Sequence, residues 1–250
     1  MKSPRSSEKS GSQLVFPMRI NRYLKERGFS TRRGADELIE AGLVLINGEK
    51  AKLGDRVQAS DEVRLLGDGR GEDDELRYFA YYKPRGIISH SPQRNEKSIA
   101  DLVRIPNIFP VGRLDKASEG LMILTNDGRV TERLLHPRFQ HEKEYEVSVR
   151  ESLPENITTR LENGIQSDGE HLSARKVVVI GSRRLRIVLT EGKKHQIRRM
   201  LDYLSLTVET LRRVRIMHLT LGTMKPGEKR KLVGQEKRKF LSVLEIIDER

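Results

Sequence analysis

The 250-residue chain contains no cysteine, so disulfides and thiolate metal sites are excluded. Its six histidines show neither HxxxH nor HExxH spacing, and we expect no metal site. No apolar run approaches the roughly 18 residues that cross a bilayer. Residues 1–13 also lack the apolar centre of a signal peptide. These absences predict a cytoplasmic, metal-free protein that does not insert into a membrane.

Positive charge, in contrast, is abundant. The chain has 48 Lys and Arg against 36 Asp and Glu, a formal net charge of +12 and a pI near 9.9. A surface of this kind releases the counterions of a polyanion that it covers, so nucleic acid is the first candidate partner. An anionic membrane surface is the second candidate.

Composition divides the chain into five segments. In order, these are a polar disordered tail (1–16), a small module (17–66), a linker (67–75), a larger domain (76–224) and a basic extension (225–250). The linker, GDGRGEDDE, has three Gly and five acids and no apolar side chain, which is typical of a domain boundary. For the extension, an additional RNA-binding tail and a simply solvated tail remain equally open.

The small module is expected to begin with two short helices. Their apolar residues recur at helical spacing, and Gly28 and Gly42 are placed to end them. A short apolar strand, 43–46, then meets Asn47 and Gly48, a strong hairpin-turn signal. Another face of the helices carries basic residues with almost no acid, which favours phosphate binding over an ordinary solvated face. These residues are Arg19, Arg22, Lys25, Arg32 and Arg33.

In the larger domain, short strands are mixed with helices. Strands are predicted at 78–82, 120–125, 144–149, 177–180 and 185–189, and helices at 129–135 and 196–203. Short strand pairs dominate this order. It predicts an α+β domain with a mostly antiparallel central sheet flanked by helices.

The densest segment for chemistry is VGRLDKASEGLMILTNDG, residues 111–128. Asp115 lies there in a tight charged loop, between Arg113 and Lys116, before an apolar strand. An isolated loop aspartate more often caps or pairs locally than reacts. A catalytic role for Asp115 therefore depends on the remaining motifs.

A second segment, HEKEYEV (141–147), places Tyr145 at the start of a strand with its side chain toward the core. Such a tyrosine is most often only a packing residue. A third, TEGKKHQIRRM (190–200), opens a helix on whose partly buried side Arg198 lies, where an arginine generally needs an anionic partner. The neighbouring Lys193, Lys194 and Arg199 are candidate RNA-binding residues, the two lysines because helix starts suit phosphate.

Four motifs occur in a fixed order: KPRGI (83–87), VGRLDKASEGLMILTNDG (111–128), HEKEYEV (141–147) and EGKKHQIRRM (191–200). Together they resemble the bacterial ribosomal RNA pseudouridine synthases of the small-subunit type, over residues 18–224. The segment from Arg19 to Arg64 is similar to the S4 RNA-binding domain that precedes the catalytic domain in that family. RRVRIMHLTL (212–221) most resembles the F-type members, which modify 23S ribosomal RNA. Many relatives have Thr in place of Ser118, and both residues offer a hydroxyl.

The resemblance implies an isomerase that breaks the N1–C1′ bond of a uridine, turns the uracil and joins its C5 to C1′. It implies Asp115 as the catalytic carboxylate, Arg198 as its ion-pair partner and Tyr145 as the residue that stacks on the uracil. Arg113 is suited to fill the space that an extruded base leaves. Whether Asp115 attacks C1′ or removes a C2′ proton stays open.

The reaction involves no redox change and no departing group, so no cofactor is expected. The expected substrate is ribosomal RNA, with 23S favoured, 16S less so and tRNA open as a second substrate, and a monomer is the simplest assembly. The alternative function is a catalytically inactive S4-containing ribosome-assembly factor. Its mark would be the loss of Asp115, Tyr145 or Arg198, and all three are present. A methyltransferase would need a Gly-rich strand–helix turn, and we find none.

Overall fold

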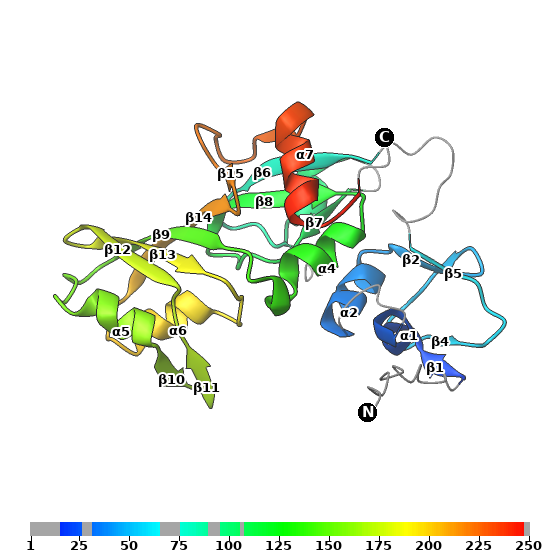
Figure 1. The fold of residues 1–250 in the computed structure, drawn as a ribbon, viewed down its shortest axis with the longest axis horizontal. Helices are drawn as coiled ribbons and strands as arrows, with labels where there is room; N and C mark the ends of the chain where they lie inside the picture. The colour runs from blue at the N-terminus through cyan, green and yellow to red at the C-terminus, as the bar shows by residue number, and fades with distance from the viewer. Residues whose placement is uncertain (1–15, 27–31, 66–75, 90–95, 106–107, 248–250) are drawn as a thin grey trace, which may run out of the picture.

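A computed structural model describes residues 16–26, 32–65, 76–89, 96–105 and 108–247, which form a small N-terminal module and a larger domain (Figure 1). For residues 25, 26 and 32–34 it describes the backbone only. The predicted tail (1–16), except Phe16, and the predicted linker (67–75) lie outside the described residues. Every helix in the described ranges is too short or too polar to cross a lipid bilayer.

The N-terminal module consists of two helices and five short strands. In chain order these are β1 (Met18–Arg19), α1 (Ile20–Glu26), α2 (Arg32–Glu40), β2 (Val44–Ile46), β3 (Glu49–Lys50), β4 (Arg56–Val57) and β5 (Val63–Leu65). The helices pack together through apolar residues at helical spacing, including Ile20 and Leu24 of α1 and Leu38 of α2, each at most 2 % exposed. This confirms the two predicted helices.

The β2–β3 hairpin turns at the predicted pair. Asn47 has φ 53° and Gly48 has φ 88°, so both lie in the left-handed region that a two-residue type I′ turn requires. Ile46 and Glu49 are direct cross-strand partners on either side of the turn. The Asn-Gly signal therefore sets the register of this hairpin.

The larger domain contains the remaining elements. Its strands are β6 (Tyr78–Lys83), β7 (Phe109–Val111), β8 (Glu119–Thr125), β9 (Lys143–Val149), β10 (Ile165–Ser167), β11 (Glu170–Leu172), β12 (Lys176–Gly181), β13 (Arg184–Leu189), β14 (Val208–Ile216), β15 (Leu219–Thr220) and β16 (Lys229–Lys231). Its helices are α3 (Ile99–Val103), α4 (Arg129–Leu135), the 3-10 turn η1 (Pro137–Phe139), α5 (Ile157–Asn163), α6 (Gln196–Asp202) and α7 (Gly234–Val243).

A nine-stranded sheet is the centre of this domain. Seven strands follow the order β12-β13-β9-β14-β8-β6-β16, while β15 pairs with β14 and β7 with β8. Only the β14–β8 pairing is parallel among these strands; the others are antiparallel. The prediction of an α+β fold with a mostly antiparallel central sheet is confirmed.

Each face of the sheet is covered by its own helices. On one side, α3, α5 and α6 pack over a cluster that includes Met122, Leu124 and Ile187. On the other, α4 and α7 pack over a cluster that includes Leu121 and Ile123. We call these sides the α6 face and the α7 face. Successive residues of β8 alternate between them, as the two-residue period of a strand dictates.

The basic C-terminal segment is not an extension outside the domain. β16 pairs antiparallel with β6 at one edge of the sheet, and Arg230 forms a bidentate pair with Glu236 of α7 at 2.5 and 2.8 Å. Phe240 of α7 is fully buried, its ring centroid 6.3 Å from that of Tyr78 in an edge-to-face arrangement. The predicted boundary at 224 is therefore wrong for the described residues 225–247. A charged edge strand, which blocks further strand pairing, resembled a solvated tail in sequence.

Candidate active site

Asp115 lies in the loop between β7 and β8, and a buried lysine, Lys83, binds the backbone of this loop. Lys83, the last residue of β6, has no exposed surface, and its Nζ donates to the backbone oxygens of Ser118 (2.7 Å), Asp115 (3.1 Å) and Pro84 (3.1 Å). Burial lowers the pKa of Lys83 to about 8, an effect that the nearby Asp115 carboxylate opposes. Three carbonyls replace the water that the ammonium lost, and together they fix the loop.

The rest of the KPRGI segment clamps the same loop through its backbone. Gly86, at φ 87°, donates its N–H to the Lys116 oxygen at 2.7 Å. Just beyond the motif, the Ser89 hydroxyl donates to the Leu114 oxygen (2.9 Å) and accepts from the Leu114 nitrogen (3.1 Å). The first sequence motif therefore positions the second.

Two cationic or protonatable side chains flank the Asp115 carboxylate. Arg198 of α6 places its Nε 3.9 Å from Oδ2, and His195 places Nε2 3.4 Å from Oδ1. Arg198 also donates through Nη2 to the Ser118 hydroxyl at 3.2 Å and to the Ala117 oxygen at 3.4 Å. The predicted Asp115–Arg198 pair is thus formed, and Ser118 holds the guanidinium in place.

His195 was not a candidate from the sequence. It precedes α6 with φ 51°, a left-handed conformation that turns the chain out of the preceding loop and into the helix. Histidine spacing gave no signal for it, because its partner lies 80 residues earlier in the chain. Only the fold brings the imidazole to Asp115.

Tyr145 and Lys83 are the two ends of a series of directly opposed residues that crosses the central sheet. Across the sheet, Lys83 of β6 is opposite Gly120 of β8, Gly120 opposite Arg213 of β14, and Arg213 opposite Tyr145 of β9. Directly opposed residues point to the same side of a sheet, here the α6 face, where the Asp115 loop also lies. Tyr145 is 9 % exposed and belongs to the apolar cluster that contains Leu114.

Gly120 permits the close approach of strands in this series. A Cβ at this position would lie 2.3 Å from the Arg213 oxygen and 2.6 Å from its nitrogen, both backbone atoms that cannot move aside. Its φ of 113° is also one that L side chains rarely adopt. Gly120 is therefore required where the parallel β14–β8 pairing begins.

Arg113 is exposed. Burial raises the pKa of Glu37 on α2, and the Arg113 guanidinium opposes this shift through its charge. The residue predicted to replace an extruded base is therefore within electrostatic reach of the S4-like module, as well as two residues from Asp115.

The predicted RNA-binding residues fall into three groups. Arg19, Arg22 and Lys194 are exposed. Lys193 and Arg199 have protein partners: Lys193 Nζ lies 2.6 Å from the His171 oxygen and 3.5 Å from Glu191, and Arg199 pairs with Glu170 at 2.6 Å and Asp168 at 3.1 Å. Arg32 and Arg33 are the first residues of α2, and their side chains lie outside the described ones.

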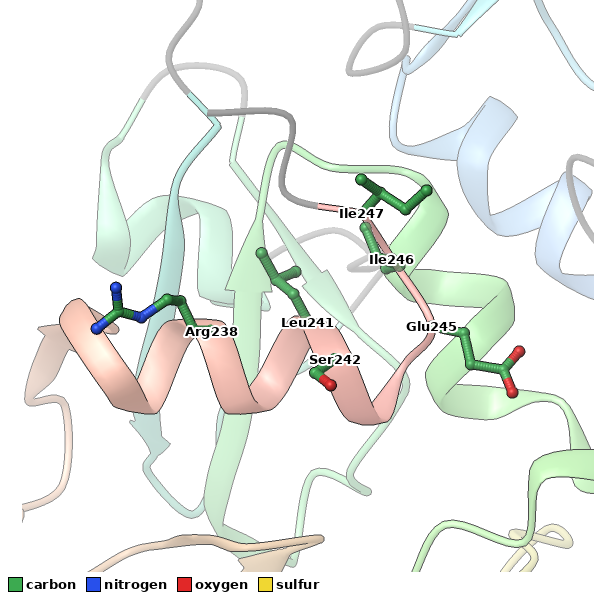
Figure 2. A pocket seen from close by; sticks show the side chains of 6 residues that line it. All are labelled: Arg238, Leu241, Ser242, Glu245, Ile246 and Ile247. Atoms are coloured by element: carbon green, nitrogen blue, oxygen red, sulfur yellow. The ribbon is translucent and has the colours of Figure 1, made fainter.

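None of these residues lines the pocket that Figure 2 shows beside α7. That pocket is formed by Arg238, Leu241, Ser242, Glu245, Ile246 and Ile247. It is an open hollow on the α7 face, whereas the Asp115 loop belongs to the α6 face. Among the described residues, no group of three His, Asp or Glu side chains is placed to hold a metal ion.

The site thus consists of one carboxylate between a guanidinium and an imidazole, in the domain that follows a small separate module. Sequence comparison identifies the class. Residues 77–203 match the RNA pseudouridylate synthase family, and residues 18–63 match the S4 domain. The chain belongs to the RNA pseudouridine synthase family, an isomerase family, and carries an N-terminal S4 domain.

Individual relatives agree with this assignment. The dual-specificity RNA pseudouridine synthase RluF of Salmonella typhi is 39% identical over 222 residues, which cover 87% of this chain and 76% of the relative. The ribosomal large subunit pseudouridine synthase B of Bacillus subtilis is 33% identical over 228 residues, covering 87% and 93%. A crystal structure of a pseudouridylate synthase superposes with a TM-score of 0.67 at 27% identity, covering 90% of this chain and 99% of the other.

Proposed function

We propose that this enzyme isomerises a specific uridine of ribosomal RNA to pseudouridine and that Asp115 is its catalytic carboxylate. The observation that carries the proposal is the placement of Asp115. Its backbone is fixed by Lys83, and its two oxygens are flanked by Arg198 and His195. The adjacent guanidinium supplies the opposite charge that a carboxylate needs where bound RNA excludes water.

The chemistry requires only one carboxylate. A glycosidase needs two because it must protonate a leaving group and activate water, whereas here the uracil stays and water must be kept out. Asp115 acts on the ribose, either at C1′ as a nucleophile or at C2′ as a base. Tyr145 stacks on the uracil, and Arg113 occupies the place of the extruded base, which offsets the few kcal/mol that flipping costs.

The relatives and the positive charge support a substrate class. One relative is named for the ribosomal large subunit, so we propose 23S ribosomal RNA as the main substrate, with tRNA as an open candidate for a second. The S4 domain, with Arg19, Arg22, Arg32 and Arg33, and Lys193, Lys194 and Arg199 of the larger domain supply phosphate contacts. We further propose that the enzyme acts as a monomer in the cytoplasm.

Asp115→Asn tests the catalytic assignment. We expect this variant to bind RNA as the wild type does, because shape and the surrounding cations are kept, and to form no detectable pseudouridine. Carbodiimide-dependent primer-extension stops on ribosomal RNA would measure the product. A variant that modified RNA at the wild-type rate would exclude Asp115 as the catalytic carboxylate.

The substrate is tested separately. Pseudouridines are mapped in 23S RNA, 16S RNA and tRNA from cells with and without the gene, and the purified enzyme is then added to RNA from the deletion strain. A 23S site that is lost in the deletion and restored by the enzyme would support the proposal. A site found only in 16S RNA or tRNA would contradict it.

A further inference from the structure

Two buried cations on the α6 face have no carboxylate partner among the described residues. Arg213 of β14 is 4 % exposed and Lys143 of β9 is 7 % exposed. Arg213 Nε donates to the Leu121 oxygen at 2.7 Å, but its Nη2 is buried without a hydrogen-bond partner. Within the described ranges, Lys143 Nζ donates to the His141 oxygen alone, at 3.3 Å. The Lys143 ammonium and the Arg213 guanidinium therefore have fewer hydrogen-bond partners there than donors.

Such an arrangement is costly. Burial of a cation is normally accompanied by an opposite charge or by a full set of hydrogen bonds, and an unmade bond of a charged group is destabilising. Burial and the neighbouring Arg213 lower the pKa of Lys143 to about 8, so the two charges also oppose each other. Lys83 shows the contrast, because three backbone oxygens surround its Nζ. The described residues supply no such partner for Lys143 and Arg213, so the pair is suited to bind an electron-rich group of a ligand.

The position of the pair indicates what that partner is. Arg213 is the direct cross-strand neighbour of Tyr145, and Lys143 is two residues before Tyr145 on the same strand. Residues two apart on a strand point to the same side, and Leu189, the neighbour of Lys143 on β13, belongs to the cluster of the α6 face together with Tyr145. The three side chains therefore share the α6 face, with a bulge in β14 directly after Arg213. The proposed function places the uracil against Tyr145 and beneath the loop of Asp115. Its carbonyl oxygens then meet the two cations.

We propose that Lys143 and Arg213 are catalytic residues that stabilise the uracil anion while it is detached, an inference that rests on the proposed function. When the C1′–N1 bond breaks, its electron pair leaves with N1 and the charge spreads to O2 and O4. Lys143 Nζ and Arg213 Nη2 donate to those oxygens, where the charge develops. C5 of the anion then bonds C1′, the C5 proton leaves, and N1 takes up a proton, so no oxidant or co-reactant is needed.

Lys143→Met tests the proposal, because it keeps the length of the side chain and removes the charge. We expect the single-turnover rate on deletion-strain 23S RNA to fall about 100-fold or more, the size found for removing one preorganised donor. The thermal midpoint should stay the same or rise, since a poorly satisfied buried charge is lost. A structural lysine would lower the midpoint instead. Lys143→Arg, which keeps the charge, should restore part of the rate.

The second readout varies the leaving group. RNA carrying 5-fluorouridine at the target contains a uracil that is more acidic at N1 and needs less stabilisation when it departs. The rate deficit of Lys143→Met and of Arg213→Gln, followed as loss of the nucleoside in digested RNA by mass spectrometry, should shrink on this substrate. Arg213→Lys is the charge-keeping control if Arg213→Gln does not fold.

The outcomes separate the two proposals. If the wild-type enzyme makes no pseudouridine in ribosomal RNA, the proposed function fails. If the wild type is active and Lys143→Met is equally fast, or loses the same factor on both substrates, the anion-stabilising role fails while the function stands.

Discussion

The two faces of strands β9 and β14 differ in whether their cationic side chains are paired with carboxylates. On the α7 side, Arg215 pairs with Glu144 at 2.7 Å, and Glu146 pairs with both Arg186 (2.9 Å) and Arg212 (2.5 Å). Burial alone would raise the pKa of Glu146, but the hydrogen bonds from Arg212 and Arg186 outweigh it and the pKa ends below its usual value. On the α6 side, Lys143 and Arg213 have no carboxylate partner among the described residues.

This difference distinguishes charged residues that stabilise the fold by pairing with each other from the two cations, Lys143 and Arg213, that we propose bind the substrate. The paired residues are partly exposed, with Arg186 and Arg212 showing 48% and 43% of their side chains, so solvent shares their stabilisation. The unpaired cations are almost fully buried, which is the more costly environment. A destabilising residue of this kind is typical of a position at which the side chain contributes to activity and not to stability.

Lys83→Met is expected to give the largest effect on the α6 face. Three carbonyls, that of Ser118 in a buried hydrogen bond and those of Asp115 and Pro84 in partly buried ones, would lose their donor. At about 1 kcal/mol each, the free energy of unfolding should fall by about 3 kcal/mol. The Asp115 loop would lose its anchor, and pseudouridine formation should drop with it. Urea unfolding and single-turnover assays measure both. If Lys83→Met were as stable as the wild type, the distinction between satisfied and unsatisfied cations on this face would be lost.

The pH dependence of stability tests whether Lys143 is a buried cation without a carboxylate partner. Its pKa is about 8 in the folded protein and about 10.4 in an unfolded chain, so between these values the unfolded state binds more protons. The stability of the wild type should therefore rise with pH relative to Lys143→Met, by about 1–2 kcal/mol between pH 7 and 9.5. Urea unfolding of both proteins across that range gives the difference. A flat difference would show that Lys143 is not held in a desolvating environment.

Much of the fold was predictable because local pattern and tertiary environment agree. Helix α4 has the predicted bounds, 129–135, and five strands of the central sheet lie where the sequence predicted them. Strand β9 buries one face and alternates accordingly, whereas β8 is buried on both faces and is marked by a continuous apolar run. The Asp115–Arg198 pair was also predictable, since both residues sit in motifs of the family.

β14 shows why the rest could not be predicted. It is the longest strand and lies at the centre of the sheet, yet Arg212, Arg213 and Arg215 interrupt its apolar pattern. The carboxylates that make Arg212 and Arg215 tolerable belong to β9, about 70 residues earlier in the chain. Likewise, His195 and Lys83 acquire their roles only through contacts with the distant Asp115 loop. Contacts of this kind join residues that are far apart in the chain, so they cannot be predicted from short segments of the sequence.

The smallest effect is expected on the paired face, from Glu146→Gln. The substitution removes a carboxylate that two partly exposed arginines share, and exposed ion pairs contribute about 1 kcal/mol or less, so the unfolding free energy should fall by about 1 kcal/mol. The rate should stay within about twofold of the wild type, because neither arginine faces the α6 side and the amide keeps the shape of the side chain. Raising the ionic strength should diminish the stability difference, since salt screens exposed charges. A rate loss comparable to that of Lys143→Met, at unchanged RNA affinity, would mean that the charges of both faces act on the reaction, and the division between them would be wrong.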